Sequence, residues 1–139
     1  MNRSFGLALG AVAVIATWGM ANVVGEKAPK AGTRAVTLPV HGHQLAYLSS
    51  GDRVDIVMTF QIQNAKGEAE PVSATILQNI PILDLDKSAG LVQLQLDPGE
   101  AQYAVLSMQD DRDLWITKRE PGDTATPAME MAAFRKLFK

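Results

Sequence analysis

The chain has no cysteine among its 139 residues and only two histidines. Without cysteine it can form no disulfide, no thiolate nucleophile and no cysteine-ligated zinc or iron–sulfur site. A basic excess is also missing, because 13 Lys and Arg residues stand against 15 Asp and Glu residues. This balance gives no electrostatic footprint for nucleic acid, so we expect no nucleic-acid partner. The length allows one compact domain and excludes a large multidomain enzyme.

Charge is absent from one long stretch near the N-terminus, the 20 residues Phe5–Val24. A helix of this length spans roughly 30 Å, the hydrocarbon thickness of a bilayer. We therefore expect a short tail over residues 1–4 and a transmembrane anchor over residues 5–24. Residues 25–32, with Pro29 and two glycines, are expected to form a linker.

A cleaved signal peptide, covering residues 1–21, is the alternative for the same stretch. The small residues Gly19 and Ala21 have the spacing that a signal peptidase needs. The bulky Trp18 and Met20 favour an uncleaved anchor instead. Basic residues flank the stretch on both sides, so charge alone does not fix its orientation. We expect export of the C-terminal part, which is the commoner outcome ahead of a β-rich domain.

Residues 33–123 carry a hydrophobic period of two, which is typical of half-buried strands. The clearest alternation places five apolar residues on one face: Val54, Ile56, Met58, Phe60 and Ile62. Turn-forming residues at Asn64–Glu70 and a second alternation over Val72–Ile76 predict a hairpin. Four more strands are expected, at Arg34–Val40, Ile82–Asp86, Leu91–Leu96 and Leu114–Lys118. The predicted fold class is mainly β, a small β-clip-like or barrel-like sheet domain.

Two sites in this domain have the chemistry of a turn or a bend. Gly51 and Asp52 can form a tight turn that leads into the long strand. Gln78 and Asn79, shortly before Pro81, predict a bend or bulge where a strand changes direction.

Two charged residues, Arg53 and Asp55, alternate on the polar face of the long strand. They are candidates for partner binding, and maintenance of the fold is the competing interpretation.

One short helix, about residues 98–109, is expected between the last two strands. Asp97 can cap it, Pro98 suits the first helical position, and Glu100 stands where a capping box needs a carboxylate. The residues that recur at helical spacing are expected to face the sheet: Ala101, Ala104, Val105 and Met108.

The C-terminal residues 124–139 form a separate tail in this prediction. Within it, Ala128–Lys139 combines helix formers with an apolar stripe and a basic end, so we expect a short amphipathic helix. About 12 residues are marginal as an isolated helix. The stripe residues Phe134, Leu137 and Phe138 are therefore candidates for contact with a partner, a membrane or the domain itself.

The sequence contains few residues in patterns typical of catalysis or metal binding. His41 and His43 would point to one side of a strand, as a metal pair requires, but a metal site needs three or four ligands. No carboxylate lies within eight positions of either histidine, so a solvated loop is favoured. No nucleophile elbow and no phosphate-binding glycine motif occurs. We expect no catalytic residue, no metal and no cofactor.

Five runs in order carry a more particular pattern, and together they resemble the CpaB/RcpC family, assembly proteins of the Flp (tight adherence, Tad) type IV pilus. They span residues 32–123: GTRAVTLPV at 32–40, SSGDRVDIVMTF at 49–60, TILQNIPILDLD at 75–86, LVQLQLDPGEAQYAVL at 91–106 and LWITKREPGD at 114–123.

The resemblance implies a non-enzymatic subunit of the pilus secretion apparatus. It implies a single-pass inner-membrane protein whose β domain lies in the periplasm and binds other pilus assembly proteins, with the outer-membrane secretin as the expected partner. Association between several copies stays open. Family members usually carry a SAF-type β-clip domain after the membrane segment, and in this chain an eight-residue linker stands there instead. Functions of that module, including contact with cell-wall glycan, do not carry over.

Two other functions stay open at this point. A periplasmic binding module for a glycan or a small ligand would need a pocket lined by convergent polar groups near His41, His43 and Asp55. A metal-dependent enzyme would need the two histidines to share an ion with a carboxylate.

Overall fold

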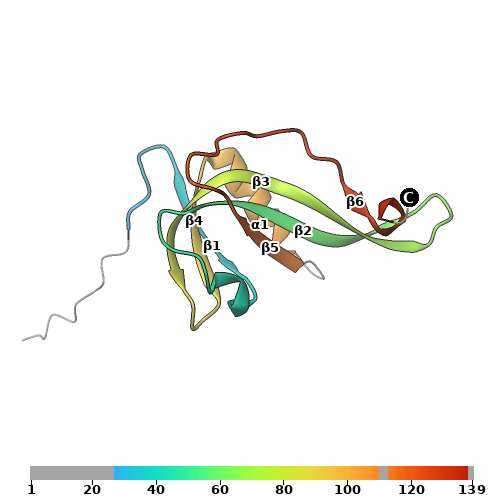
Figure 1. The fold of residues 1–139 in the computed structure, drawn as a ribbon, viewed down its shortest axis with the longest axis horizontal. Coiled ribbons are helices and arrows are strands. Elements are labelled where there is room, and N and C mark those ends of the chain that lie inside the picture. The colour runs from blue at the N-terminus through green and yellow to red at the C-terminus, as the bar shows by residue number, and fades with distance from the viewer. Residues whose placement is uncertain (1–26, 110–112, 138–139) are drawn as a thin grey trace, which may run out of the picture.

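The computed structural model describes residues 27–109 and 113–137, and Figure 1 shows their arrangement. The elements follow in this order: β1 Arg34–Pro39, the 3-10 turn η1 Gly42–Leu45, β2 Arg53–Gln63, β3 Ala69–Asp86, β4 Leu91–Leu96, α1 Pro98–Ser107, β5 Asp113–Lys118, β6 Ala132–Ala133 and the 3-10 turn η2 Phe134–Lys136. The anchor expected over residues 5–24 lies outside the described residues. Within the described part of the chain, no helix has the length and apolar character needed to cross a bilayer.

The strands form one antiparallel sheet in the order β1-β4-β3-β2-β5, and β6 adds to β3. The predicted mainly β class with one α-helix is confirmed. The sheet is open: β1 and β5 lie at its two ends and do not pair with each other, so it does not close into a barrel. One reason is local, because the side chain of Gln44 occupies the free edge of β5. Its amide donates to Leu114 O at 3.1 Å and accepts from Ile116 N at 2.8 Å.

The long strand β3 connects the two halves of the sheet. Its first part pairs with β2 and its last part pairs with β4. Between them, Asn79 adopts a positive φ of 57°, and the register of β2 against β3 shifts beside it. Asn tolerates this left-handed conformation better than most residues, so a sharp change of direction is possible without glycine. The bend lets one strand serve two differently oriented groups of strands.

The hydrophobic core lies where these two groups meet under η1 and α1. The largest fully buried apolar side chains come from five elements: Leu38, Leu45, Val54, Ile56, Ile80, Val92, Leu94 and Leu96. On β2 only Val54 and Ile56 are buried, whereas Met58, Phe60 and Ile62 are half-buried. The reason is visible in Figure 1, where the outer part of the β2–β3 hairpin extends beyond the body of the domain.

The helix α1 covers the sheet with its small residues. Ala104 and Ser107 are buried, and Ala101 packs against the core. The expectation that Val105 and Met108 face the sheet is wrong, since their exposed fractions are 52% and 43%. The inward stripe follows positions 101, 104 and 107, three residues apart, and this spacing turns the larger side chains toward solvent. Small inward residues let the helix lie close to the strands.

The amphipathic helix expected over Ala128–Lys139 is also wrong for the described residues of the tail. Ala132–Ala133 forms the short strand β6, and Phe134–Lys136 forms a single 3-10 turn. The edge of β3 offers backbone hydrogen-bond partners to an extended tail, whereas an isolated helix of this length is marginal. Pairing with Val72 and Ser73 of β3 therefore replaces the helix.

Candidate partner-binding surface

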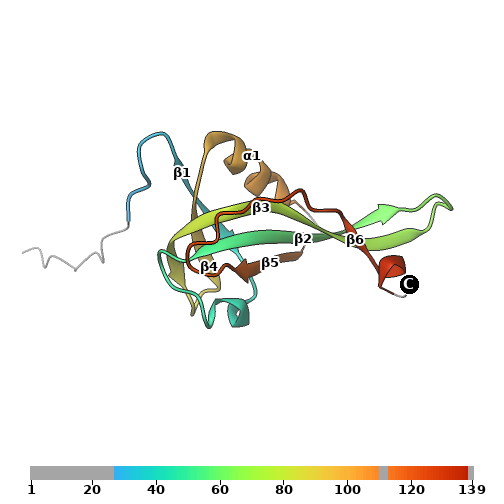
Figure 2. The ribbon, with the colours of Figure 1, turned by 45° about the horizontal axis from the view of Figure 1, so that its top comes forward.

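The outer part of the β2–β3 hairpin, residues 57–76, is the most protruding part of the described chain, and we call it the arm (Figures 1 and 2). Its tip is organised by Asn64, whose side-chain oxygen accepts from Lys66 N at 2.9 Å and Glu68 N at 3.0 Å. Gly67 completes the turn with a φ of 76°. The arm is thus a defined hairpin that points away from the core.

A segment without regular structure, residues 119–131, returns from β5 along β3 to the arm, and we call it the strap. Figure 2 shows it running along β3 toward β6. Arg119 fixes its start, donating from Nε to Asp55 Oδ1 and from Nη1 to Ala125 O, both at 2.6 Å. The hydrogen bond that Arg119 donates to Asp55 raises the pKa of Arg119, so the guanidinium stays charged. Further along, Gln78 Nε2 donates to Pro127 O at 2.9 Å.

Beyond the strap, the tail residues 132–137 attach to the arm. β6 pairs with β3 through Val72 and Ser73. Arg135 lies 3.7 Å from Glu70, whose side chain is only 12% exposed. Beside this pairing, arm and tail together line a pocket of about 230 Å³. Its lining residues are Thr59, Pro71, Ser73, Ala132, Ala133, Phe134 and Leu137. The tail is therefore placed on the arm by backbone pairing and one ion pair.

Several large apolar side chains of the strap and tail face solvent in this arrangement. Phe134 is 58% exposed and Leu137 is 70% exposed, and Met129 and Met131 of the strap are exposed as well. Grouped exposed apolar side chains are typical of an interaction site. Phe138, the third predicted contact residue, lies outside the described residues. We call Phe134, Leu137 and the adjoining pocket the tail surface.

The tail surface lies far from the point where the described chain begins. In Figure 1 the first described residues, drawn in blue, are at one end of the long axis. The arm and the end of the described chain are at the other end. A component tethered through its N-terminal part would therefore present the tail surface at its distant end.

The other predicted contact residues, Arg53 and Asp55, are engaged within the domain. Arg53 Nη1 donates to the backbone oxygen of Asn79 at 2.6 Å and to its side-chain oxygen at 3.1 Å. Asp55 Oδ1 accepts from Asn79 N at 2.8 Å as well as from Arg119. These contacts hold the bend of β3 and the start of the strap. Sequence reasoning missed Arg119 because no local pattern links it to a residue 64 positions away.

The predicted turn residues Gly51 and Asp52 lie beside the bend. Gly51 has a φ of 92°, and Asp52 Oδ2 accepts from Ser49 N at 2.8 Å. The same carboxylate forms an ion pair of 2.9 Å with Lys118. The hydrogen bond from Lys118 and that from Ser49 N lower the pKa of Asp52. Gly51 N and Asp52 O also bond to Ile82 beyond Pro81, so this turn and β3 hold each other.

The start of α1 has the geometry of a capping box. Asp97 Oδ1 accepts from Glu100 N at 2.7 Å, and Glu100 Oε2 accepts from Asp97 N at 2.8 Å. Pro98 occupies the first helical position, where a missing N–H costs nothing. These three residues fix where the helix leaves β4.

The two histidines lie together beside β5. Their rings stack with centroids 5.8 Å apart, and both contact Trp115. The fold brings a distant carboxylate close, since His41 Nε2 lies 3.7 Å from Asp113 Oδ1. Among the residues that the structure describes, no group of three potential ligands could hold a metal ion.

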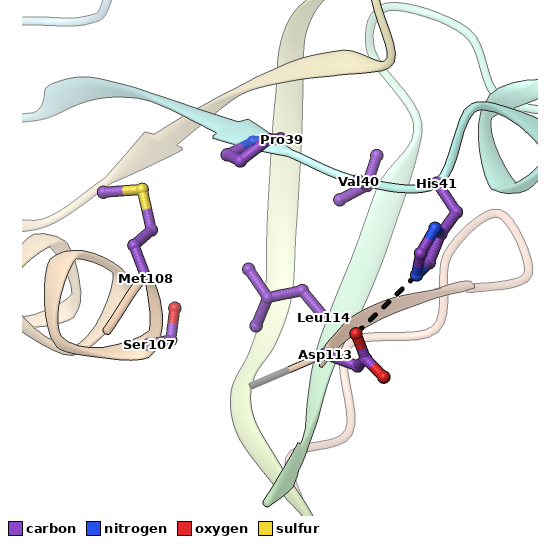
Figure 3. A pocket seen from close by; sticks show the side chains of 7 residues that line it. All are labelled: Pro39, Val40, His41, Ser107, Met108, Asp113 and Leu114. Atoms are coloured by element: carbon purple, nitrogen blue, oxygen red, sulfur yellow. Dashed lines mark ion pairs between the residues drawn. The ribbon is translucent and has the colours of Figure 1, made fainter. Parts of the chain in front are cut away.

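A pocket of about 310 Å³ opens next to His41 and Asp113, as Figure 3 shows. Its remaining lining is mostly apolar and comes from the end of β1, the end of α1 and β5: Pro39, Val40, Ser107, Met108 and Leu114. Asp55 is not among its lining residues, and its carboxylate accepts from Arg119 instead. This pocket therefore lacks the convergent polar lining that a glycan or small-ligand site needs.

The sequence of this chain matches the model of one protein family over most of its length. The model of a family described as Flp pilus assembly protein RcpC/CpaB matches residues 19–113. The chain belongs to this family. No curated protein and no solved structure matches it. The matched residues include β1 to β4 and α1, whereas the strap and the tail lie beyond them. The RcpC/CpaB family membership therefore gives a role in Flp pilus assembly, and the tail surface has to be understood from this chain's own residues.

Proposed function

We propose that this RcpC/CpaB family member is a non-enzymatic subunit of the Flp pilus secretion apparatus, anchored in the inner membrane with its β domain, residues 33–123, in the periplasm. The family match supports the assembly role. The uncharged stretch Phe5–Val24, long enough to cross a bilayer, supports the single-pass anchor.

The partner that we propose is another envelope component, with the outer-membrane secretin as the first candidate. One observation carries this proposal: Phe134 and Leu137 are more than half exposed although β6, directly before them, pairs with β3. An exposed apolar side chain next to a paired strand gains burial on binding, and less backbone has to be ordered for it. The position of the tail surface at the end distant from the first described residues (Figure 1) suits a subunit that reaches from one membrane toward another.

Among the predicted contact residues, we assign partner binding to Phe134 and Leu137. Arg53 and Asp55 receive a different role, maintenance of the fold, because their polar groups are already bonded to Asn79 and Arg119. Releasing them for a partner would leave those internal groups without their hydrogen bonds.

The test is co-purification of the secretin with the full chain from solubilised cell envelopes. We expect the double variant Phe134→Ala with Leu137→Ala to lose most of the captured secretin while the domain stays folded. Met129→Ala is the matched control, because Met129 is 59% exposed on the strap and does not line the tail pocket. Equal capture by all three proteins would reject the assignment of the tail surface.

A further inference from the structure

The helix α1 has an unusual distribution of side chains. Its inward stripe consists of small residues, whereas the larger Val105 and Leu106 are 52% and 56% exposed. No charged residue follows Glu100 on this helix. A surface helix normally turns its large apolar residues inward and its charged residues outward. The outer face of α1 therefore has the composition of a face that is covered by another surface.

Beside this face lies an edge of the sheet that no strand of the described residues covers. The edge of β5 is occupied by the Gln44 side chain, and β6 pairs with part of the outer edge of β3. β1 is the last strand on its side, and no described strand pairs with its outer edge. An open strand edge readily accepts another strand. β1 thus offers backbone groups next to the apolar face of α1.

The open edge and the apolar helix face share one groove. It has a volume of about 620 Å³, and its apolar walls include Ala35 and Val36 from β1 and Ala101, Val105 and Leu106 from α1. An occupant of this groove could pair with β1 and bury the α1 side chains at the same time.

We propose that the occupant is a second copy of this chain. The two β1 strands would pair antiparallel about a twofold axis, which joins the two sheets into one continuous sheet. The same axis places both α1 helices on one face of the joined sheet, where Val105 and Leu106 of each copy cover those of the other. In such an interface each copy pairs the strand edge and covers the helix face of the other, and both copies use the same residues, as a twofold contact requires.

The charges of β1 fit this arrangement. Its sequence, RAVTLP, carries a single charge, on its first residue Arg34. Antiparallel pairing centred on Val36 places each Arg34 opposite the partner's uncharged Leu38, so the two like charges do not face each other. Pairing centred on either neighbouring residue, Ala35 or Thr37, also keeps them apart.

The chain outside the structure also favours a second copy, and this step rests on the proposed anchor. The uncharged stretch ends at Val24, ten positions before β1 begins at Arg34. Ten extended residues reach roughly 35 Å. Copies anchored in one membrane would therefore hold their β1 edges within a narrow layer, where the local concentration of the partner is high.

Disulfide cross-linking tests the proposal, and no natural cysteine of the chain competes with the introduced one. The full chain is produced in its native membrane as Ala35→Cys, Val36→Cys or Thr37→Cys, one at a time. Lys66→Cys, at the exposed tip of the arm, reports random collisions. Directly paired residues bring their Cβ atoms to about 4.5–5.5 Å, close to disulfide geometry. We expect one of the three β1 variants, at the twofold axis, to form far more covalent dimer than Lys66→Cys.

A second substitution tests the helix face in the β1 variant that cross-links best. Val105→Glu brings like charges together at the seam and should reduce the dimer to the Lys66→Cys background. Tyr103→Glu is the matched control, since Tyr103 is also exposed on α1, at 63%, but does not line the groove. Circular dichroism verifies that both variants are folded.

Two results would overturn the second-copy proposal. One is cross-linking of all three β1 variants at the collision background. The other is an equal effect of Val105→Glu and Tyr103→Glu. Secretin capture is not part of either measurement, so this proposal and the proposed function can fail separately.

Discussion

Arg119 Nε donates a 2.6 Å hydrogen bond to Asp55 Oδ1, and this contact joins the end of β5 to the start of β2. The Arg119 side chain is only 6% exposed. Asp55 also accepts from the backbone of Asn79, at the bend of β3. The pair therefore couples the bend of β3 to the strap, which leads on to the tail surface. The contacts of Arg119 thus help to position the tail surface, although they lie at the start of the strap and the tail surface follows its end.

Removing the Arg119 guanidinium should loosen the strap before the core. Arg119→Gln loses the bonds to Asp55 and to Ala125 O, so backbone amides over residues 120–131 should exchange faster with deuterium while those of β4 keep their protection. Arg34→Gln, which removes an exposed arginine on β1, serves as the control. Adding Asp55→Asn to Arg119→Gln should increase the exchange of the strap amides little further, because both substitutions break the same contact. Unchanged exchange of the strap in Arg119→Gln would contradict this coupling.

The Asp52–Lys118 ion pair should make stability depend on acid pH. The pKa of Asp52 in the folded domain is below its ordinary value of 3.8, mainly because of the hydrogen bond from Lys118. A carboxyl with a lowered folded-state pKa contributes stability above pH 3.8, and this contribution is lost as the pH falls through the folded-state pKa. In Lys118→Met the pKa of Asp52 should rise toward 3.8 in an NMR titration. Lys66→Met should leave the pKa of Asp52 unchanged. If Lys118→Met also leaves the pKa of Asp52 unchanged, the assignment is wrong.

The capping box at α1 should contribute measurably to stability. Asp97→Ala leaves Glu100 N without its acceptor, and loss of such a cap typically costs about 1 kcal/mol. Urea unfolding followed by circular dichroism measures the change in the free energy of unfolding. Gln102→Ala, an exposed change on the same helix, should cost nothing because alanine has the higher helix propensity. Equal stability of the Asp97→Ala variant and the natural chain would show that the cap is not needed.

Local patterns in the sequence predicted much of the fold. The alternation in LVQLQL matches the burial of β4, where Val92, Leu94 and Leu96 are all inside. The start of α1 was also predictable, because a capping box involves residues only three positions apart. Both features are decided by neighbouring residues, so a reader of the sequence can find them.

The path of the tail could not be predicted in this way. Helix formers dominate Ala128–Lys139, but the edge of β3 and the carboxylate of Glu70 decide its conformation, and both belong to a distant part of the chain. Helical spacing likewise could not show which side of α1 meets the sheet, since small and large apolar residues alternate around it. Val105 was expected inside and is exposed for this reason. The tail surface depends on such tertiary contacts.

Site-specific photo-cross-linking shows whether the tail surface binds a pilus assembly protein. A photoreactive amino acid replaces Leu137 in the full chain, in cells that assemble the pilus, and the captured proteins are identified by mass spectrometry. Replacement of Lys66 at the tip of the arm is the control. We predict that the Leu137 probe captures a pilus assembly protein of the envelope, the secretin first, more strongly than the Lys66 probe. Capture of lipid alone, or of the same proteins at equal strength from both positions, would contradict it.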